Sequence, residues 1–173
     1  FTISFNLEEQ KDSVAKLLAH PNINIQAPEN YEKGDDMWWL KEDGSWDMEK
    51  IQLGTQQIKQ YGFDIKLASN PRIKDFDAIV ETCQKRGYKL VLNLLAENIE
   101  AIELLVGKEL SFLIRRNRDL LVKRYSLPNV VVVNNLESVG DKSFTDRDFP
   151  TEHYDAIGRK AIAINLRDSI LKL

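Results

Sequence analysis

The chain has 173 residues, of which 43% are hydrophobic and 29% charged, and its formal net charge is −3. This length and composition are those of one soluble globular domain with a substantial core. The small negative charge gives no overall field for nucleic acid or an anionic membrane, so no nucleic-acid partner is expected and the isolated chain is expected to be soluble, while a membrane anchor stays open for the full-length protein. Two distant histidines and the single Cys83 give neither a disulfide nor a metal-ligand spacing, and we expect no metal and no cofactor.

The N-terminal part combines a strand-like start with a predicted insertion. Residues 1–5 read Phe-Thr-Ile-Ser-Phe without an initiator Met, and we expect the chain to be the C-terminal part of a longer protein. Residues 20–70 are predicted to form an irregular and helical insertion that contains all three tryptophans. Within it, Ser45 is predicted to cap a helix that begins at Trp46 and ends before Gly62.

The remaining chain alternates helices and short buried strands. A helix is predicted over 71–86, where proline is acceptable in the first turn and Gly87 ends the helix. The next run, 88–95, is apolar on both faces, which is typical of a parallel strand covered by helices on both sides. A helix with a break near Gly107 is predicted over 99–125, followed by a second buried strand over 129–133.

The last predicted helix spans 154–171, with an apolar face formed by Ile157, Ala161, Ile164 and Leu171. Helix, strand, crossover helix, strand and helix is the order of a three-layer, doubly wound α/β fold with a mainly parallel sheet. We therefore predict that residues 1–173 form a single domain of this class. Ligands of such sheets bind beyond the carboxyl ends of the strands, where the loops at 96–98 and 134–152 are predicted to meet.

The main candidate for chemistry, His153, directly follows the second of these loops. A histidine at a loop-to-helix junction suits a general base, and it needs a carboxylate to fix its tautomer. Asp146, Asp148 and Glu152 are the nearby carboxylates in the sequence. The alternative is that Asp148 or Thr151 caps the terminal helix and that His153 is a solvated residue of its first turn.

The stretch His153-Tyr-Asp-Ala-Ile-Gly158-Arg-Lys-Ala-Ile-Ala163 resembles the last block of the SGNH (GDSL-like) hydrolases. Within that superfamily the order of elements over residues 72–173 is most similar to the C-terminal half of the DltD-like, D-alanyl transfer proteins. The resemblance implies that His153 is the catalytic base. The family places an aspartate three residues before this histidine, where this chain has Pro150, so the acid would be Asp148, Asp146 or Glu152.

The resemblance also implies a function. The Gly-Asp-Ser block that carries the SGNH nucleophile does not occur in this sequence. We expect an acyl-ester hydrolase or acyltransferase that acts on a cell-envelope glycan or polymer, in an extracytoplasmic compartment, when an N-terminal serine block completes it. The chain alone is expected to be inactive.

Further polar and aromatic residues are candidates for substrate binding. Glu97 and Asn98 follow the first strand, and the Asn98 amide is predicted either to donate to an oxyanion or to cap the next helix. Trp38 and Trp39 suit either a sugar-stacking platform or an anchor for the insertion. Arg115, within a basic run, suits either an anionic polymer or a solvated helix face. The alternative function is therefore a non-catalytic glycan- or protein-binding domain.

Overall fold

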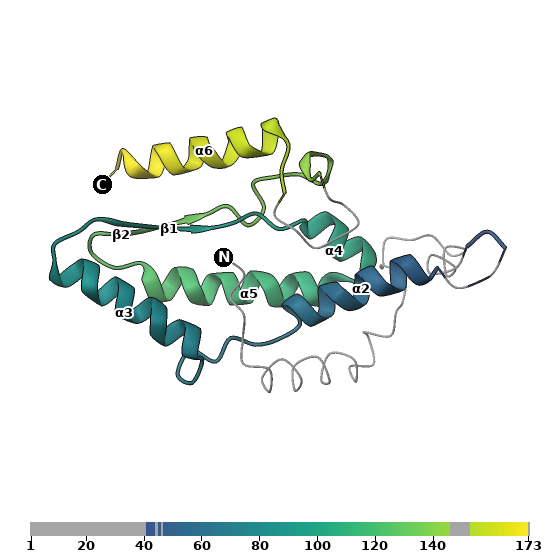
Figure 1. The fold of residues 1–173 in the computed structure, drawn as a ribbon, viewed down its shortest axis with the longest axis horizontal. Coiled ribbons are helices and arrows are strands. Elements are labelled where there is room, and N and C mark those ends of the chain that lie inside the picture. Colours follow the sequence, from purple (N-terminus) through teal and green to yellow (C-terminus); the bar gives the residue numbers. More distant parts are fainter. Residues whose placement is uncertain (1–40, 44, 46, 146–152, 173) are drawn as a thin grey trace.

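The computed structural model describes residues 41–43, 45, 47–145 and 153–172. In chain order its elements are α2 (Met48–Tyr61), α3 (Pro71–Lys85), β1 (Leu90–Leu94), α4 (Ile99–Leu105), α5 (Lys108–Tyr125), β2 (Val130–Asn134), the 3₁₀ helix η1 (Asp141–Ser143) and α6 (Ala156–Ile170) (Figure 1). The described part is thus a mixed α/β structure in which helices alternate with two strands. From α3 onward the order of elements is the predicted one.

Local side-chain chemistry explains where the first helices begin. The Asp47 carboxylate accepts a hydrogen bond from Lys50 N at 3.2 Å and caps α2, so the predicted cap at Ser45 is wrong. The Ser45 hydroxyl instead donates to Asp43 Oδ1 at 2.6 Å. Asn70 caps α3 in front of its N-terminal proline.

Two glycines mark helix ends, as the sequence predicts. Gly87 follows α3 with φ of 67°, and Gly107 separates α4 from α5 with φ of 119°. Residues with a Cβ rarely adopt such angles, so these positions favour glycine. The break at Gly107 therefore divides the predicted long helix into two.

The two strands run parallel, with Leu90 opposite Val130 and Leu94 opposite Asn134. Alternate side chains face opposite ways. Leu90, Leu92 and Leu94 pack with Val130 and Val132 into one hydrophobic cluster. The same cluster includes buried residues of α3 and α5, so this face of the sheet is apolar throughout.

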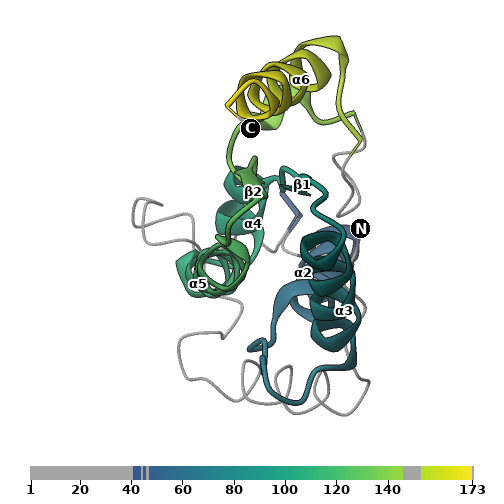
Figure 2. The same ribbon diagram turned by 90° about the vertical axis from the view of Figure 1, so that its left-hand side faces the viewer.

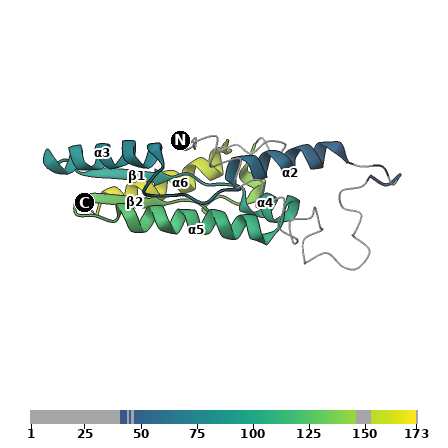
Figure 3. The same ribbon diagram turned by 90° about the horizontal axis from the view of Figure 1, so that it is seen from below.

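Helices cover both faces of the sheet. Viewed end-on, α6 lies on one face, while α5, α3 and α2 lie on the other (Figure 2). Seen from below, α3 runs alongside β1 and α5 runs alongside β2, and α2 continues toward α4 (Figure 3). Both α5 and α6 contact β2.

The second half of the predicted insertion belongs to the core. Ile58 of α2 is buried in a cluster with Ile99, Ile102, Leu105, Val106, Leu110, Ile114 and Leu136. Phe63 and Ile65, which follow α2, are buried in the cluster under the sheet. Among the described residues, no helix is both long and apolar enough to traverse a lipid bilayer.

The buried face of α6 differs from the predicted one. Ile157 and Leu171 are 73% and 77% exposed, whereas Gly158 and Ile162 are buried. Ile162 packs against Ala96, Val139, Phe144 and Tyr154, with Leu166 beside them. The sequence pattern failed here because α6 carries apolar residues on several sides, and the close approach at Gly158 selects which side faces the sheet.

Candidate functional site

The loops after the two strands meet at one edge of the sheet. The Tyr154 hydroxyl donates to the carbonyl oxygen of Ala96 at 2.7 Å, and Asn98 Nδ2 donates to Asp141 Oδ1 at 2.8 Å. Glu97 N donates to Leu136 O at 3.0 Å. These contacts join the turn after β1 to the segment between β2 and α6, which is the placement expected for parallel strands.

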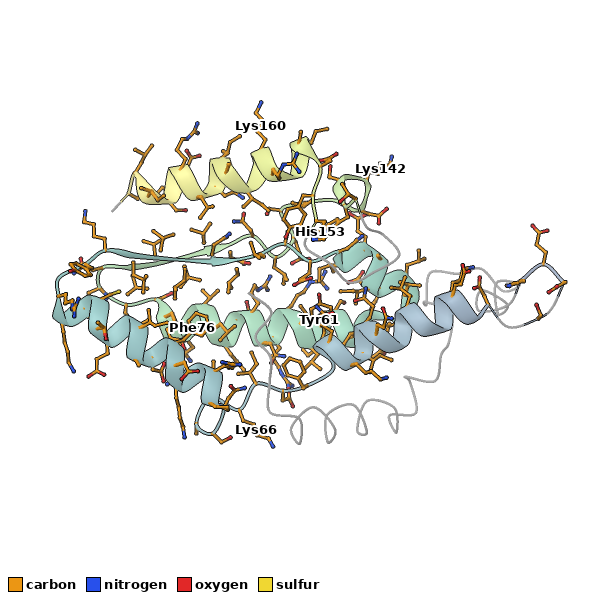
Figure 4. All side chains as sticks on the ribbon, viewed as in Figure 1. Tyr61, Lys66, Phe76, Lys142, His153 and Lys160 are labelled. Atoms are coloured by element: carbon orange, nitrogen blue, oxygen red, sulfur yellow. The ribbon has the colours of Figure 1, made fainter. Side chains whose placement is uncertain are left out.

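His153 belongs to this junction but not to a helix. It is exposed and precedes α6 by three residues. Its carbonyl oxygen accepts hydrogen bonds from Thr145 N at 2.9 Å and from Thr145 Oγ1 at 3.1 Å. Tyr154 forms an isolated antiparallel bridge with Phe144. The histidine backbone is therefore held against the opposite side of its own loop, and His153 is labelled near the connection from β1 to α4 (Figure 4).

The start of α6 differs from the predicted one. Asp155 caps this helix, because its carboxylate accepts from Gly158 N at 2.8 Å. The predicted caps Asp148 and Thr151 are wrong, and His153 is not in the first turn. Asp146, Asp148 and Glu152, the predicted carboxylate partners of His153, lie outside the described residues, so their roles stay predictions.

The two polar residues after β1 face different surroundings. Asn98 caps α4, accepting from Ala101 N at 3.0 Å, while its amide nitrogen donates to Asp141. The capping alternative is therefore confirmed. To bind an oxyanion, the Asn98 amide nitrogen would have to break its hydrogen bond to Asp141. Glu97 instead accepts a 2.5 Å hydrogen bond from the Tyr61 hydroxyl, and both residues line a cavity.

This cavity has a volume of about 450 Å³ and lies between β1 and the helices beneath it. Its lining residues with polar side-chain atoms are Gln60, Tyr61, Asn93, Glu97, Asn117, Arg118 and Tyr125, and the other lining residues are apolar. Tyr61 and Phe76 lie on the α5 side of the strands (Figure 4). Neither Asn98 nor His153 lines the cavity. The turn at 96–98 connects the two, because Glu97 lines the cavity and Ala96 accepts the hydrogen bond from Tyr154, the neighbour of His153.

Tyr61 and Asn93 are site residues that the sequence did not predict. Asn93 interrupts the otherwise apolar strand β1, and Tyr61 is the last residue before the helix-ending Gly62; these were the available signals. Asn93 Oδ1 accepts from Asn135 Nδ2 at 2.7 Å, and Asn135 Oδ1 accepts from Asn165 Nδ2 of α6 at 2.6 Å. Asn135 is fully buried. This amide ladder fixes α6 over the sheet, and buried polar groups require such partners.

The predicted substrate-binding cation Arg115 is engaged in ion pairs. It contacts Glu103 at 2.9 Å and Glu137 at 2.6 Å, which joins α4, α5 and the segment after β2. The hydrogen bond from Arg115 lowers the pKa of Glu137, and Glu137 in turn raises the pKa of Arg115. Other arginines of α5 are also paired: Arg116 with Asp64, Arg118 with Asp119 and Glu137, and Arg124 with Asp77. An anionic polymer would have to displace these carboxylates.

The Asp77 cluster joins α3 to α5 beside the cavity. Arg124 donates to both carboxylate oxygens of Asp77 at 2.9 and 2.6 Å, and the Tyr125 hydroxyl donates to the same residue at 3.1 Å. The hydrogen bond from Arg124 lowers the pKa of Asp77. Burial is the main cause that raises the pKa of Tyr125 to about 12.

The lowered pKa of Asp77 predicts a pH-dependent contribution to stability. The contribution is present above the unfolded-state value of about 3.9 and is lost as the pH falls through the lower folded-state value. Asp77→Asn should reduce the free energy of unfolding by about 1 kcal/mol at pH 7, since the partly exposed pair is screened by solvent. Urea denaturation between pH 2 and 7 should show this difference shrinking below about pH 4.

Asp119→Asn is the matched control for Asp77→Asn. Asp119 pairs with Arg118 on the same helix, but its side chain is 68% exposed. The control should change stability little at any pH. A constant difference between Asp77→Asn and the parent across this pH range would contradict the prediction.

Trp38 and Trp39 lie outside the described residues, so their predicted roles are untested. Among the residues that the structure describes, no group of three or more histidine, cysteine or carboxylate side chains could hold a metal ion. The chain matches no model of a known protein family, no curated protein and no solved structure.

Proposed function

We propose that the chain is an SGNH-type, DltD-like α/β domain that takes part in acyl-ester hydrolysis or acyl transfer on a cell-envelope glycan or polymer. One observation carries the proposal: the hydrogen bond from Tyr154 to Ala96 holds the segment of His153 against the turn after β1. A base in that position lies beyond the carboxyl end of a parallel strand, where catalytic groups of doubly wound folds gather. The finer fold class, a three-layer doubly wound sheet, is part of the same proposal.

In the proposed reaction His153 accepts the proton of a serine hydroxyl, and the serine oxygen attacks the ester carbonyl carbon. The serine comes from a segment outside these 173 residues, since the sequence contains no Gly-Asp-Ser block. The tetrahedral intermediate collapses when the alcohol leaves with the proton from His153. Water or an acceptor hydroxyl then attacks the acyl-serine, so that hydrolysis and transfer differ only in the acceptor.

The arrangement supplies two supporting features for this chemistry. His153 is exposed, so a substrate or a second segment can reach its ring. Its backbone is fixed by Thr145 and by the neighbouring bridge, which limits the positions that the imidazole can adopt. Asp146, Asp148 or Glu152 is the proposed carboxylate that orients it. An extracytoplasmic location follows from the proposed substrate.

A fluorophosphonate probe tests the proposal on the longer protein that contains this segment. Such probes label a serine whose hydroxyl is activated by a base. We expect labelling of the longer protein, no labelling of the 173-residue chain, and a loss of at least about 100-fold in labelling rate in His153→Gln. His20→Gln, at the other histidine of these 173 residues, is the matched control and should label at the parent rate.

Circular dichroism at the labelling temperature should show His153→Gln to be folded, since its side chain is exposed. Labelling that survives His153→Gln would overturn the role of this histidine. A longer protein that is folded but shows no labelling would overturn the hydrolase proposal itself.

A further inference from the structure

Helix α6 carries large apolar side chains on the side away from the sheet. Ile157, Ile164 and Leu171 are all exposed. Successive members of this set are seven residues apart, so the three side chains follow one line along the helix for about 21 Å. The other side of α6 packs on the sheet through the buried Gly158 and Ile162. The helix therefore has a second apolar stripe, which points away from the rest of the described structure.

Basic side chains follow this apolar stripe. Lys160 and Arg167 each come three residues after an isoleucine of the stripe, which places them on the neighbouring line of the helix. Both are exposed, and Lys172 after the stripe is exposed as well. Lys160 extends from α6 on the side away from the sheet (Figure 4). The outer face of α6 thus consists of Ile157, Lys160, Ile164, Arg167, Leu171 and Lys172.

The cations of the outer face differ from those of α5 in their partners. Every arginine of α5 pairs with a carboxylate. Lys160 and Lys172, in contrast, form no ion pair within the described part of the chain. Arg167 pairs with the adjacent Asp168 at 2.7 Å, and this is the one carboxylate among residues 156–172, which contain four cations. The outer face therefore carries a net positive charge.

This positive charge is local. The whole chain has a formal net charge of −3, which gives no overall attraction to an anionic surface. At physiological ionic strength, however, exposed charges interact over only about 8 Å. A surface in contact with the outer face of α6 would therefore meet mainly its cations and its apolar stripe. The partner that complements this face is both apolar and anionic.

The order of charged and apolar residues disfavours another helix as that partner. A coiled-coil seam needs an apolar residue three or four positions after each member of the stripe. After Ile164 these positions hold Arg167 and Asp168, which a packed helix would have to bury. A second copy of α6 would bury the same charges on both sides. A lipid interface has no such restriction, because lysine and arginine extend along the apolar surface and place their charges among the headgroups.

We propose that the outer face of α6 binds the surface of an anionic lipid membrane. The helix lies parallel to the surface, its apolar stripe enters the boundary between headgroups and acyl chains, and its lysines contact lipid phosphates. The sheet and α5 then lie on the side of α6 away from the membrane (Figure 1). Binding is reversible, since three apolar side chains and a few cations give a weak interaction. The proposal is independent of the proposed function, because no residue of the outer face takes part in that reaction.

Co-sedimentation of the 173-residue chain with lipid vesicles tests the proposal. Vesicles of equal parts phosphatidylglycerol and phosphatidylcholine should bind the chain, and vesicles of phosphatidylcholine alone should bind it at least about tenfold more weakly. Raising NaCl from about 50 mM to about 500 mM should weaken binding to the anionic vesicles to a similar extent. No binding to the anionic vesicles, or equal binding to both kinds, would overturn the proposal.

Lys160→Glu and Lys123→Glu separate the local charge from the net charge. Both variants replace one cation with one anion, but Lys123 is exposed on α5, at the opposite face of the sheet (Figure 2). Lys160→Glu should weaken binding to the anionic vesicles at least about tenfold, since the lost cation and the new anion both oppose it. Lys123→Glu should bind within about twofold of the parent. An equal loss in the two variants would show that the outer face of α6 is not the binding surface.

Ile157→Ser combined with Leu171→Ser tests the apolar stripe, and Phe112→Ser is the matched control. Phe112 is 66% exposed on α5, so none of these substitutions opens the core. The double variant should weaken binding at least about tenfold, and the control should bind within about twofold of the parent. Binding that survives in the double variant would contradict insertion of the stripe.

Circular dichroism should show the same fold in the parent and in all of these variants, since each changed side chain is exposed. Sedimentation equilibrium without lipid tests a second copy as the occupant of the outer face. The parent should be monomeric by this measurement. A dimer that dissociates in the double variant would assign the outer face of α6 to a second copy and overturn the membrane proposal.

Discussion

Asn117→Leu should lower the free energy of unfolding by about 2–4 kcal/mol, since it removes the side chain that joins α5 to the segment after α2. Asn117 Oδ1 accepts from Ile65 N at 3.1 Å, and its Nδ2 donates to Phe63 O at 2.7 Å. Asn117 is 7% exposed, and Phe63 and Ile65 are also buried. Leucine has a similar size but can neither accept from the Ile65 N–H nor donate to the Phe63 carbonyl.

Urea denaturation followed by circular dichroism measures this change, with an unchanged m-value indicating that the two-state transition is preserved. Asn117→Asp retains the acceptor for Ile65 N but loses the donor to Phe63 O, and should not restore parent stability. Lys123→Ala, at an exposed position of the same helix, is the control and should stay within about 0.5 kcal/mol of the parent. Parent-like stability of Asn117→Leu would show that water or repacking replaces both hydrogen bonds.

Gly158→Ala should destabilise the protein by about 1–2 kcal/mol, although alanine is the better helix former. A Cβ at this position would lie 2.9 Å from Tyr154 Cβ and 3.0 Å from Val139 Cγ1. Tyr154 and Val139 are both buried, and the nearest atom is the first atom of a side chain rather than a flexible end. The start of α6 must therefore shift away from Val139 in the segment that follows β2.

Gly140→Ala is the matched control, because its added Cβ would meet only Glu100 Oε1 at 3.5 Å. The control should change stability by less than about 0.5 kcal/mol. Thermal denaturation measures both variants, and exchange of the Thr145 amide, which donates to His153 O, reports the local shift. Equal stability of the two variants would mean that α6 accommodates the methyl group without moving.

The sequence predicted the parts of the fold that depend on short-range chemistry. Pro71 and Gly87 bound α3, Gly107 breaks the long helical region, and two short apolar runs form the parallel strands. Each of these signals comes from backbone geometry or from a run that is apolar on both faces. The capping residues were harder to assign, since Ser45 and Asp47 are both acceptable caps and only the chain path selects Asp47.

In the candidate site, too, the sequence predicted the positions of segments but not the contacts between side chains. The sequence placed the turn at 96–98 and the segment before α6 at one edge of the sheet, and the contact from Tyr154 to Ala96 brings them together. It gave no indication that Asn98 would be engaged by Asp141 or that Arg115 would be paired with two glutamates. Such pairings join residues far apart in the sequence, so local patterns cannot predict them.

By itself, the amino-acid sequence determined the type and order of the elements between α3 and α6, because helix ends and buried strands depend on residues that are neighbours along the chain. The tertiary structure alone decided which side of α6 is buried, which acids pair with the arginines of α5, and that Tyr61 and Glu97 share a cavity. These features depend on the distance at which elements pack. At Gly158, for example, the missing Cβ permits the start of α6 to lie close to Val139 and Tyr154.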